Sequence, residues 1–192
     1  YPNVHYIVNK PLAVPSGVKL TIMPGTVLRF KSGAGINVAK GSLVCEGTIE
    51  QPIVFTQAEL NTGSLQPFNF NNNTLKYVRF ENLTFGIKFG GLWGMNNANL
   101  IHCLINNVRS SNYVLDDINT TYSNIYATDG GTQLFAGTGS HSYLNFVGNP
   151  NINLGNAQEF LPTCDEIKSS NSFGNKVEGS SDLYSIIYER KH

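Results

Sequence analysis

The sequence has little charge and no long apolar run. Only 14% of its 192 residues are charged, and thirteen Lys and Arg balance thirteen Asp and Glu. A neutral chain lacks the broad electrostatic footprint that binds nucleic acid or an anionic membrane surface. No apolar stretch approaches the ~20 residues that span a bilayer, so we expect no membrane insertion. Because the chain opens at Tyr1 rather than at a Met or a leader, we expect a mature or excised fragment.

Cysteine is scarce as well. Cys45, Cys103 and Cys164 lie far apart and lack the spacing of a metal site. An odd number argues against a complete disulfide framework. We therefore expect three buried small apolar residues, although one bridge plus a free thiol stays open. The four His are also scattered, so the sequence predicts no metal site and no cofactor.

A repeating alternation of apolar residues fills the segment Val18–Thr56. Apolar residues recur in pairs with one residue between, and Gly, Pro or Ser separates most pairs. The five pairs are Leu20/Ile22, Leu28/Phe30, Ile36/Val38, Leu43/Cys45 and Ile53/Phe55. Alternation at period two is typical of strands with one buried face, and Gly and Pro mark the turns between them. Leu20, Ile36 and Ile53 are spaced by 16 and 17 residues, which predicts a β-solenoid whose short strands stack turn upon turn.

The remaining chain divides around this core. We predict a single domain, with an N-terminal cap over residues 1–17, stacked turns with loop excursions over 18–159 and a C-terminal cap over 160–192. Val78 and Phe80 continue the inward alternation, and residues 89–99 (FGGLWGMNNAN) are predicted to leave the solenoid as an excursion. Short strands are expected near Val114, Ile118, Ile125, Leu134, 144–147 and 152–154.

A weaker register links this second half. Asn82, Asn107, Thr128 and Asn149 are spaced by 25, 21 and 21 residues, and each ends a short apolar strand. The pattern indicates longer turns with a polar residue recurring at one corner.

Two motifs carry a resemblance to a known family. Residues Val14–Thr26 follow the pattern V-P-x-G-V-x-L-x-I-x-P-G-T, and Gly41–Thr56 follow G-x-L-x-x-x-G-T-x-x-x-P-I-x-F-T. Both patterns resemble the right-handed parallel β-helix repeats of bacterial secreted and surface proteins, and Leu75–Ile87 is similar to them to a lesser degree. The resemblance implies an all-β, single-stranded right-handed parallel β-helix of roughly seven or eight turns with caps at both ends. It implies nothing specific about activity, because the same fold carries lyases, hydrolases, adhesins, phage tailspikes and stalks.

Carboxylates are the first candidates for chemistry. β-Helix enzymes that cut polysaccharide need clustered carboxylates, and here Asp116, Asp117 and Asp129, with His141 in a Gly-rich loop, are the nearest approach to a cluster. Neighbouring strand residues point to opposite faces, so only one of the two adjacent carboxylates can face a substrate. Asp117 and Asp129 are 12 residues apart, which is not a turn length. We interpret the carboxylates as turn residues and predict no catalytic residue.

Aromatic residues are the surplus of this chain. It has nine Tyr, eleven Phe and one Trp, and those expected on irregular segments are Trp93, Tyr113, Tyr122, Tyr126 and Tyr143. Flat rings beside amide side chains bind sugars by stacking and hydrogen bonding. The alternative is that Trp93 folds back over the core and that several Tyr are half-buried strand residues.

Together these features favour a non-catalytic extracellular or cell-surface module, such as an adhesin, a fibre or a fibre tip. Its expected partner is a glycan or a cell-surface protein, contacted through the aromatic loops. The alternative is a polysaccharide-degrading lyase or glycoside hydrolase that uses Asp116, Asp117 and Asp129. Monomer and trimer both stay open, because outward apolar residues such as Val44 and Leu104 would bury against sister chains in a fibre.

Overall fold

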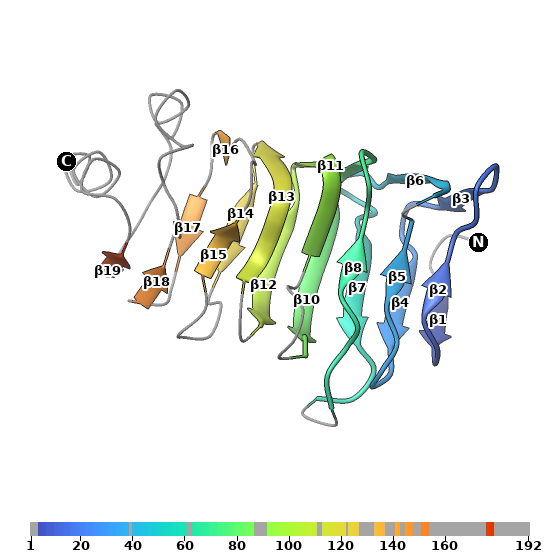
Figure 1. The fold of residues 1–192 in the computed structure, drawn as a ribbon, viewed down its shortest axis with the longest axis horizontal. Helices are drawn as coiled ribbons and strands as arrows, with labels where there is room; N and C mark the ends of the chain where they lie inside the picture. The colour runs from blue at the N-terminus through green and yellow to red at the C-terminus, as the bar shows by residue number, and fades with distance from the viewer. Residues whose placement is uncertain are drawn as a thin grey trace.

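The computed structural model describes residues 4–38, 40–60, 63–86, 92–110, 113–121, 123–126, 133–136, 141–142, 145–147, 151–153 and 176–178. Within these residues the protein is all-β, with nineteen strands and no helix, and every strand pairing is parallel. The chain winds as a β-solenoid of about four turns, and shorter strands continue its sheets toward the C-terminus (Figure 1).

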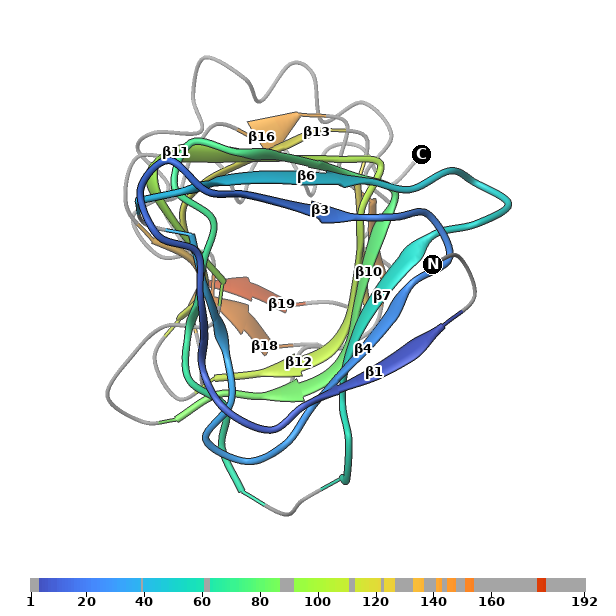
Figure 2. The ribbon, with the colours of Figure 1, turned by 90° about the vertical axis from the view of Figure 1, so that its right-hand side faces the viewer.

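Three faces surround the core, as the view along the solenoid shows (Figure 2). The first face consists of β1 (His5–Val8), β4 (Val27–Phe30), β7 (Ile53–Gln57), β10 (Val78–Thr84), β12 (Leu104–Arg109), β14 (Asn124–Tyr126) and β17 (Asn145–Val147). The second face consists of β2 (Leu12–Ala13), β5 (Ile36–Asn37), β8 (Phe68–Asn69), the first halves of β11 (Leu92–Ile101) and β13 (Tyr113–Thr121), β15 (Gln133–Ala136), β18 (Asn151–Asn153) and β19 (Lys176–Glu178). The third face consists of β3 (Lys19–Ile22), β6 (Ser42–Glu46), β9 (Thr74–Lys76), the second halves of β11 and β13, and β16 (His141–Ser142).

The predicted apolar pairs form the core. In all five pairs both residues are buried, except that Leu20 in the first turn is half-buried and packs against the core. The strand register stacks Leu28 on Phe55, Phe55 on Phe80 and Phe80 on Ile105. Each inward side chain therefore rests on its equivalent in the next turn, which confirms the period-two prediction.

Phenylalanine fills the middle of the core. Neighbouring rings have centroids 4.6 to 6.5 Å apart, and edge-to-face geometries are frequent among them. The residues in this cluster are Phe30, Phe55, Phe68, Phe70, Phe80 and Phe85. Such contacts add stability beyond the burial of apolar area.

The first turns bend at Gly residues, as predicted. The N–H of Val18 donates to the carbonyl of Pro15 (3.1 Å), and Gly17 between them has φ 77°. Gly25 has φ 75° in the next such turn. Only Gly adopts this backbone without steric cost.

Two predictions about segments were wrong. The stretch expected to leave the solenoid contains β11, a ten-residue strand that crosses from the second face to the third. Leu92, Ala98 and Leu100 on this strand are fully buried, and their apolar contacts hold the segment within the wall. The second wrong prediction concerns His141, which was expected in a loop and lies in strand β16.

Other predicted strands are confirmed. Those near Val114, Ile118, Ile125, Leu134, 144–147 and 152–154 correspond to β13, β14, β15, β17 and β18.

Candidate functional site

Tyr77 and His102 form an aromatic stack at the corner between the third and first faces. Tyr77 follows β9 and His102 follows β11, so they occupy the same position in successive turns. Their ring centroids are 4.9 Å apart and their planes differ by 13°. His102 is exposed, and Tyr77 is half-buried. The corner therefore presents stacked aromatic surface to solvent.

The backbone fixes these two rings in place. Tyr77 has φ 51° and His102 has φ 53°, a region that bulky residues rarely adopt. The N–H of Tyr77 donates to the carbonyl of Ile101, and the N–H of His102 donates to the carbonyl of Thr121, both at 3.1 Å. Because each strained residue is held by the next turn, the stack is organised before any ligand arrives.

A ladder of polar side chains runs beside the stack on the outer surface of the third face. The Nδ2 of Asn119 donates to Oδ1 of Asn99 (3.1 Å), and the Nδ2 of Asn99 lies 3.5 Å from Oγ1 of Thr74. Leu75 and Leu100, which alternate with this ladder, are fully buried. The outer side of this wall is thus amide and hydroxyl, while its inner side is apolar.

The charges near the corner are solvent-exposed. Nζ of Lys76 lies 3.5 Å from Oε1 of Glu46, and both side chains are about half exposed. Exposed ion pairs of this kind contribute little to stability. A ligand at the corner meets paired charges beside neutral amides and aromatic rings, which suits an uncharged, hydroxyl-rich molecule.

A second polar ladder lies on the first face. The Nδ2 of Asn107 donates to Oδ1 of Asn82 (2.8 Å), and both residues have positive φ. With Thr84, Arg109 and the exposed Leu60 they line a hollow of about 150 Å³. The register between Asn82 and Asn107 is confirmed, whereas Thr128 and Asn149 lie outside the described residues.

Trp93 lies in β11, with Asn69 and Asp116 as its register partners. The ladder between β11 and β13 is irregular between Trp93 and Ala98. The only Trp of the chain and one of the candidate carboxylates therefore occupy neighbouring positions on successive turns, which the sequence did not predict.

The other aromatic candidates are dispersed. Tyr113 begins β13 on the second face, and Tyr126 ends β14 on the first face. Tyr122 and Tyr143 lie outside the described residues. Tyr122 directly follows Thr121, the register partner of Ile101, just as His102 follows Ile101.

The candidate acid–base residues are not brought together by the described register. Asp116 and Asp117 lie within β13, so their interpretation as turn residues was wrong. The register partner of Asp116 on the next turn is Ala136, and Asp129 lies outside the described residues. His141 pairs with Thr120, four residues along β13 from Asp116.

The described cysteines belong to the core. Cys45 and Cys103 are free and buried, and Cys164 lies outside the described residues. Burial raises the pKa of the Cys45 thiol, and it raises the pKa of Cys103 to about 12. A thiol that stays protonated at neutral pH is a poor nucleophile and a poor metal ligand.

Among the residues that the structure describes, no group of three His, Cys, Asp or Glu is placed to hold a metal ion. The described part of the chain also contains no helix long and apolar enough to cross a membrane. The chain matches no family model, no curated protein and no solved structure.

Proposed function

We propose that this protein is a non-catalytic extracellular module that binds glycans at the Tyr77–His102 corner and along the adjoining Asn99–Asn119 ladder. One observation carries the proposal: a pre-organised, solvent-facing aromatic stack borders a row of side-chain amides. Sugar rings stack their C–H faces on aromatic rings, and their hydroxyls exchange hydrogen bonds with amides.

The solenoid supports this proposal by geometry. Turns repeat at the strand spacing of about 4.8 Å, so equivalent side chains form a straight row that suits an extended polymer. Trp93 and Asp116 form a second pair of neighbours by register.

The finer architecture is part of the same proposal. A right-handed solenoid of roughly seven or eight turns fits the order of the seven strands on the first face and the strong preference of parallel crossovers for the right hand. Residues 1–17, expected as an N-terminal cap, contribute β1 and β2 to the first turn. The sequence motifs resemble those of bacterial secreted and surface β-helix proteins, which favours a surface adhesin, a fibre or a fibre tip. Val44 and Leu104 are half-buried in the single chain, so monomer and trimer remain alternatives.

The test is binding to a broad glycan array, with a variant that removes a ring but keeps the backbone. His102→Asn is suitable because Asn tolerates positive φ better than most residues. We expect saturable binding by the parent protein and a loss of at least about fivefold, or ~1 kcal/mol, in the variant. His5→Asn, an exposed His on β1, is the matched control and should bind like the parent.

An array without any saturable ligand, or a His102→Asn protein that binds like His5→Asn, would refute the corner as the site. Trp93→Ala then tests the second pair of neighbours. If Trp93→Ala alone abolishes binding, the ligand lies on the second face instead.

A polysaccharide-degrading enzyme is the second candidate, because Asp116 is the register partner of Trp93. The same glycans are incubated with the protein and analysed for released oligosaccharide. Product that disappears in Asp116→Asn or Asp117→Asn would establish the enzyme and overturn the non-catalytic module. Binding without product supports the module.

A further inference from the structure

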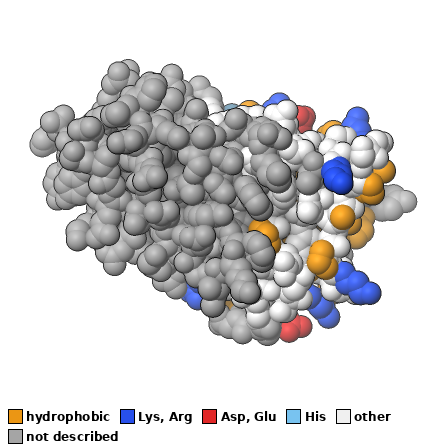
Figure 3. Space-filling view, viewed as in Figure 1, with side chains coloured by type: hydrophobic (Ala, Val, Ile, Leu, Met, Phe, Trp, Pro, Cys, Tyr) orange, Lys and Arg blue, Asp and Glu red, His pale blue; other side chains and the backbone are white. Residues whose placement is uncertain are grey.

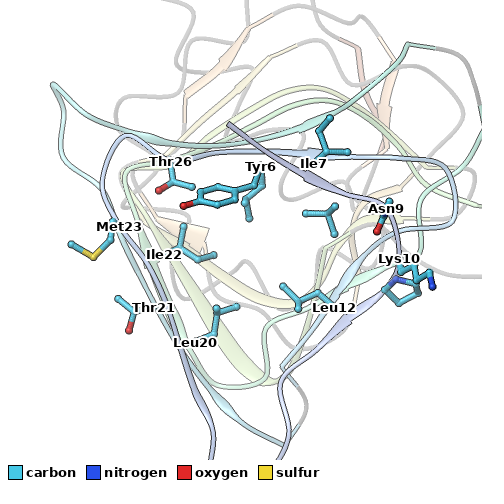
Figure 4. Close-up of a pocket in the computed structure, with 13 residues that line it drawn as sticks. Tyr6, Ile7, Asn9, Lys10, Leu12, Leu20, Thr21, Ile22, Met23 and Thr26 are labelled. Carbon is cyan, nitrogen blue, oxygen red and sulfur yellow. The ribbon is translucent and has the colours of Figure 1, made fainter. Parts of the chain in front are cut away.

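The N-terminal end of the solenoid is an open apolar hollow. It has a volume of about 490 Å³ and is lined by residues of the first turn, chiefly from β1, β2 and β3. Side chains that other turns bury are exposed here, with Tyr6 at 40% and Leu12 at 36%, whereas their register partners Leu28 and Ile36 are buried. Figure 4 shows the ring of Tyr6 across this opening, with Leu12, Leu20 and Ile22 around the space below it. We call this surface, lined by residues 6–12, 20–23, 26 and 28, the mouth.

The mouth also has unpaired strand edges. β1, β2 and β3 each pair with one described strand only, β4, β5 and β6. The carbonyls of Val4 and Val8 accept bonds from the N–H groups of Val27 and Lys31, at the two ends of β4, and the carbonyl of Val18, just before β3, accepts a bond from the N–H of Ser42. In a parallel ladder the alternate residues direct their N–H and C=O to the other side. Those residues are Ile7 on β1 and Thr21 on β3.

Charge in the first turn is one-sided. The first turn contains Lys10 and Lys19 and no Asp or Glu, whereas the second turn contains Arg29, Lys31 and Lys40 together with Glu46 and Glu50. Figure 3 shows orange apolar and blue basic side chains together at the N-terminal end of the described surface. The mouth is therefore apolar inside and basic at its rim.

We infer that the mouth binds an extended segment of another polypeptide, which pairs with a free edge of the first turn as a further parallel strand. Free backbone edges select a strand, since only an extended chain satisfies them by β-augmentation. The hollow selects apolar side chains at alternate positions, and Lys10 and Lys19 select acidic residues between them. The site is separate from the glycan corner, so it stands or falls independently of it.

A second copy of this chain fits the mouth less well. Joining two mouths would bring Lys10 and Lys19 of one copy toward the same residues of the other, and like charges at an interface are unfavourable. The opening strand edges would also have to pair antiparallel across the two-fold axis. A partner segment with acidic residues has neither disadvantage.

The test uses a synthetic peptide of about eight residues in which Glu alternates with Val, because such a strand presents an apolar and an acidic side. We expect saturable one-to-one binding to the protein by calorimetry, weakened by about tenfold or more when salt rises from 50 to 500 mM. Two control peptides need no protein variant. The first has the same composition in a scrambled order, which removes the alternation. The second is N-methylated at every second residue, which removes the backbone donors. Neither peptide should bind.

Protein variants then locate the site. Tyr6→Asp places a carboxylate in the hollow, and Thr21→Pro removes one backbone donor from the free edge of β3; each should weaken binding at least about tenfold. Leu60→Asp is the matched control, because Leu60 is exposed to 64% but lies outside the mouth. Thermal unfolding of each variant shows that it is folded.

Three results would overturn the inference. The alternating peptide fails to bind at low salt, or the N-methylated peptide binds as tightly as the parent peptide. The third result is a dimer of the protein in sedimentation that Tyr6→Asp dissociates and Leu60→Asp leaves intact. The occupant of the mouth would then be a second copy of the chain.

Discussion

Replacing Phe55 by Ala should destabilise the solenoid more than any change at its open end. Phe55 is fully buried, and four other Phe rings have centroids 5.3 to 6.5 Å from its own. Phe→Ala substitutions in cores cost about 3–5 kcal/mol through lost transfer energy and the remaining cavity. The paired strands above and below Phe55 hinder collapse of that cavity, so we expect about 4 kcal/mol.

Tyr6→Ala is the matched control for Phe55→Ala. Tyr6 pairs with Leu28, which pairs with Phe55, so both residues belong to one inward column. Tyr6 is 40% exposed at the end of that column, so its truncation should cost only ~1 kcal/mol of buried area. The free energy of unfolding is measured in urea by circular dichroism and by Trp fluorescence, with coincident transitions as the test of two-state behaviour.

An equal loss of unfolding free energy in Phe55→Ala and Tyr6→Ala would refute this prediction, because burial and ring contacts would then not determine stability in this column. A cost below about 1.5 kcal/mol for Phe55→Ala would do the same, since it would require a core that collapses freely. A change of slope in urea without a change of midpoint would indicate separate unfolding of the two ends of the solenoid.

Two further predictions concern a glycine and the buried thiols. Gly47→Ala should destabilise by about 1–3 kcal/mol in urea, because its Cβ would lie 2.7 Å from the carbonyl oxygen of Tyr77; an unchanged midpoint would contradict this close approach. Cys45 and Cys103 should resist thiol reagents at pH 8 in the folded protein and react once urea unfolds it. Because folding raises the pKa of Cys103 from 9.0 to about 12, its contribution to stability is complete below pH 9 and is lost as pH rises toward 12. Titration of the urea midpoint from pH 7 to 11 should show that fall, and Cys103→Ala should reduce it.

The regular part of the fold is predictable because its inward positions are almost all apolar. From Leu20 to Phe55 the buried side chains are aliphatic, aromatic or Cys, with Thr26 as the exception, and Gly or Pro marks the turns. The strands are therefore visible in the sequence, because a strand with one buried face has an apolar residue at every second position.

The pattern weakens where polar side chains enter the core. Thr120 and Ser123 are fully buried. The hydroxyl of Ser123 accepts a bond from the N–H of Cys103 (3.1 Å) and donates to the carbonyl of Thr121 (3.0 Å). A hydroxyl that satisfies the backbone in this way can fill an inward position without being apolar. Alternation of hydropathy does not detect such a residue, which explains the degenerate second half.

The aromatic corner is harder to predict for a different reason. Neither Tyr77 nor His102 belongs to a recognisable motif, although the sequence contains a signal for the pair. Tyr77 and His102 are 25 residues apart, and so are the hydrogen-bonded Asn82 and Asn107. The spacing at which a polar residue recurs gives the number of residues per turn. Aromatic residues separated by that number are predicted to stack, which pairs Tyr77 with His102. Trp93 was misplaced because Gly and Asn around it suggest a loop, whereas its buried neighbours on β11 determine a strand.

The two proposed sites use different properties of one repeating backbone. Along the side of the described solenoid, the paired strands satisfy most of their neighbours' backbone groups, so recognition there falls mainly to side chains, which recur in straight rows. At the N-terminal end the opposite holds, because no strand that the structure describes pairs with the outer edges of β1, β2 and β3. Side-chain chemistry therefore selects the ligand that binds along the side, and substitutions in the first turn should not affect that binding. A partner at the mouth, by contrast, must have an extended backbone. Tyr6→Asp should leave glycan binding unchanged and His102→Asn should leave peptide binding unchanged; loss of both functions in either variant would show that the two surfaces are coupled through the wall between them.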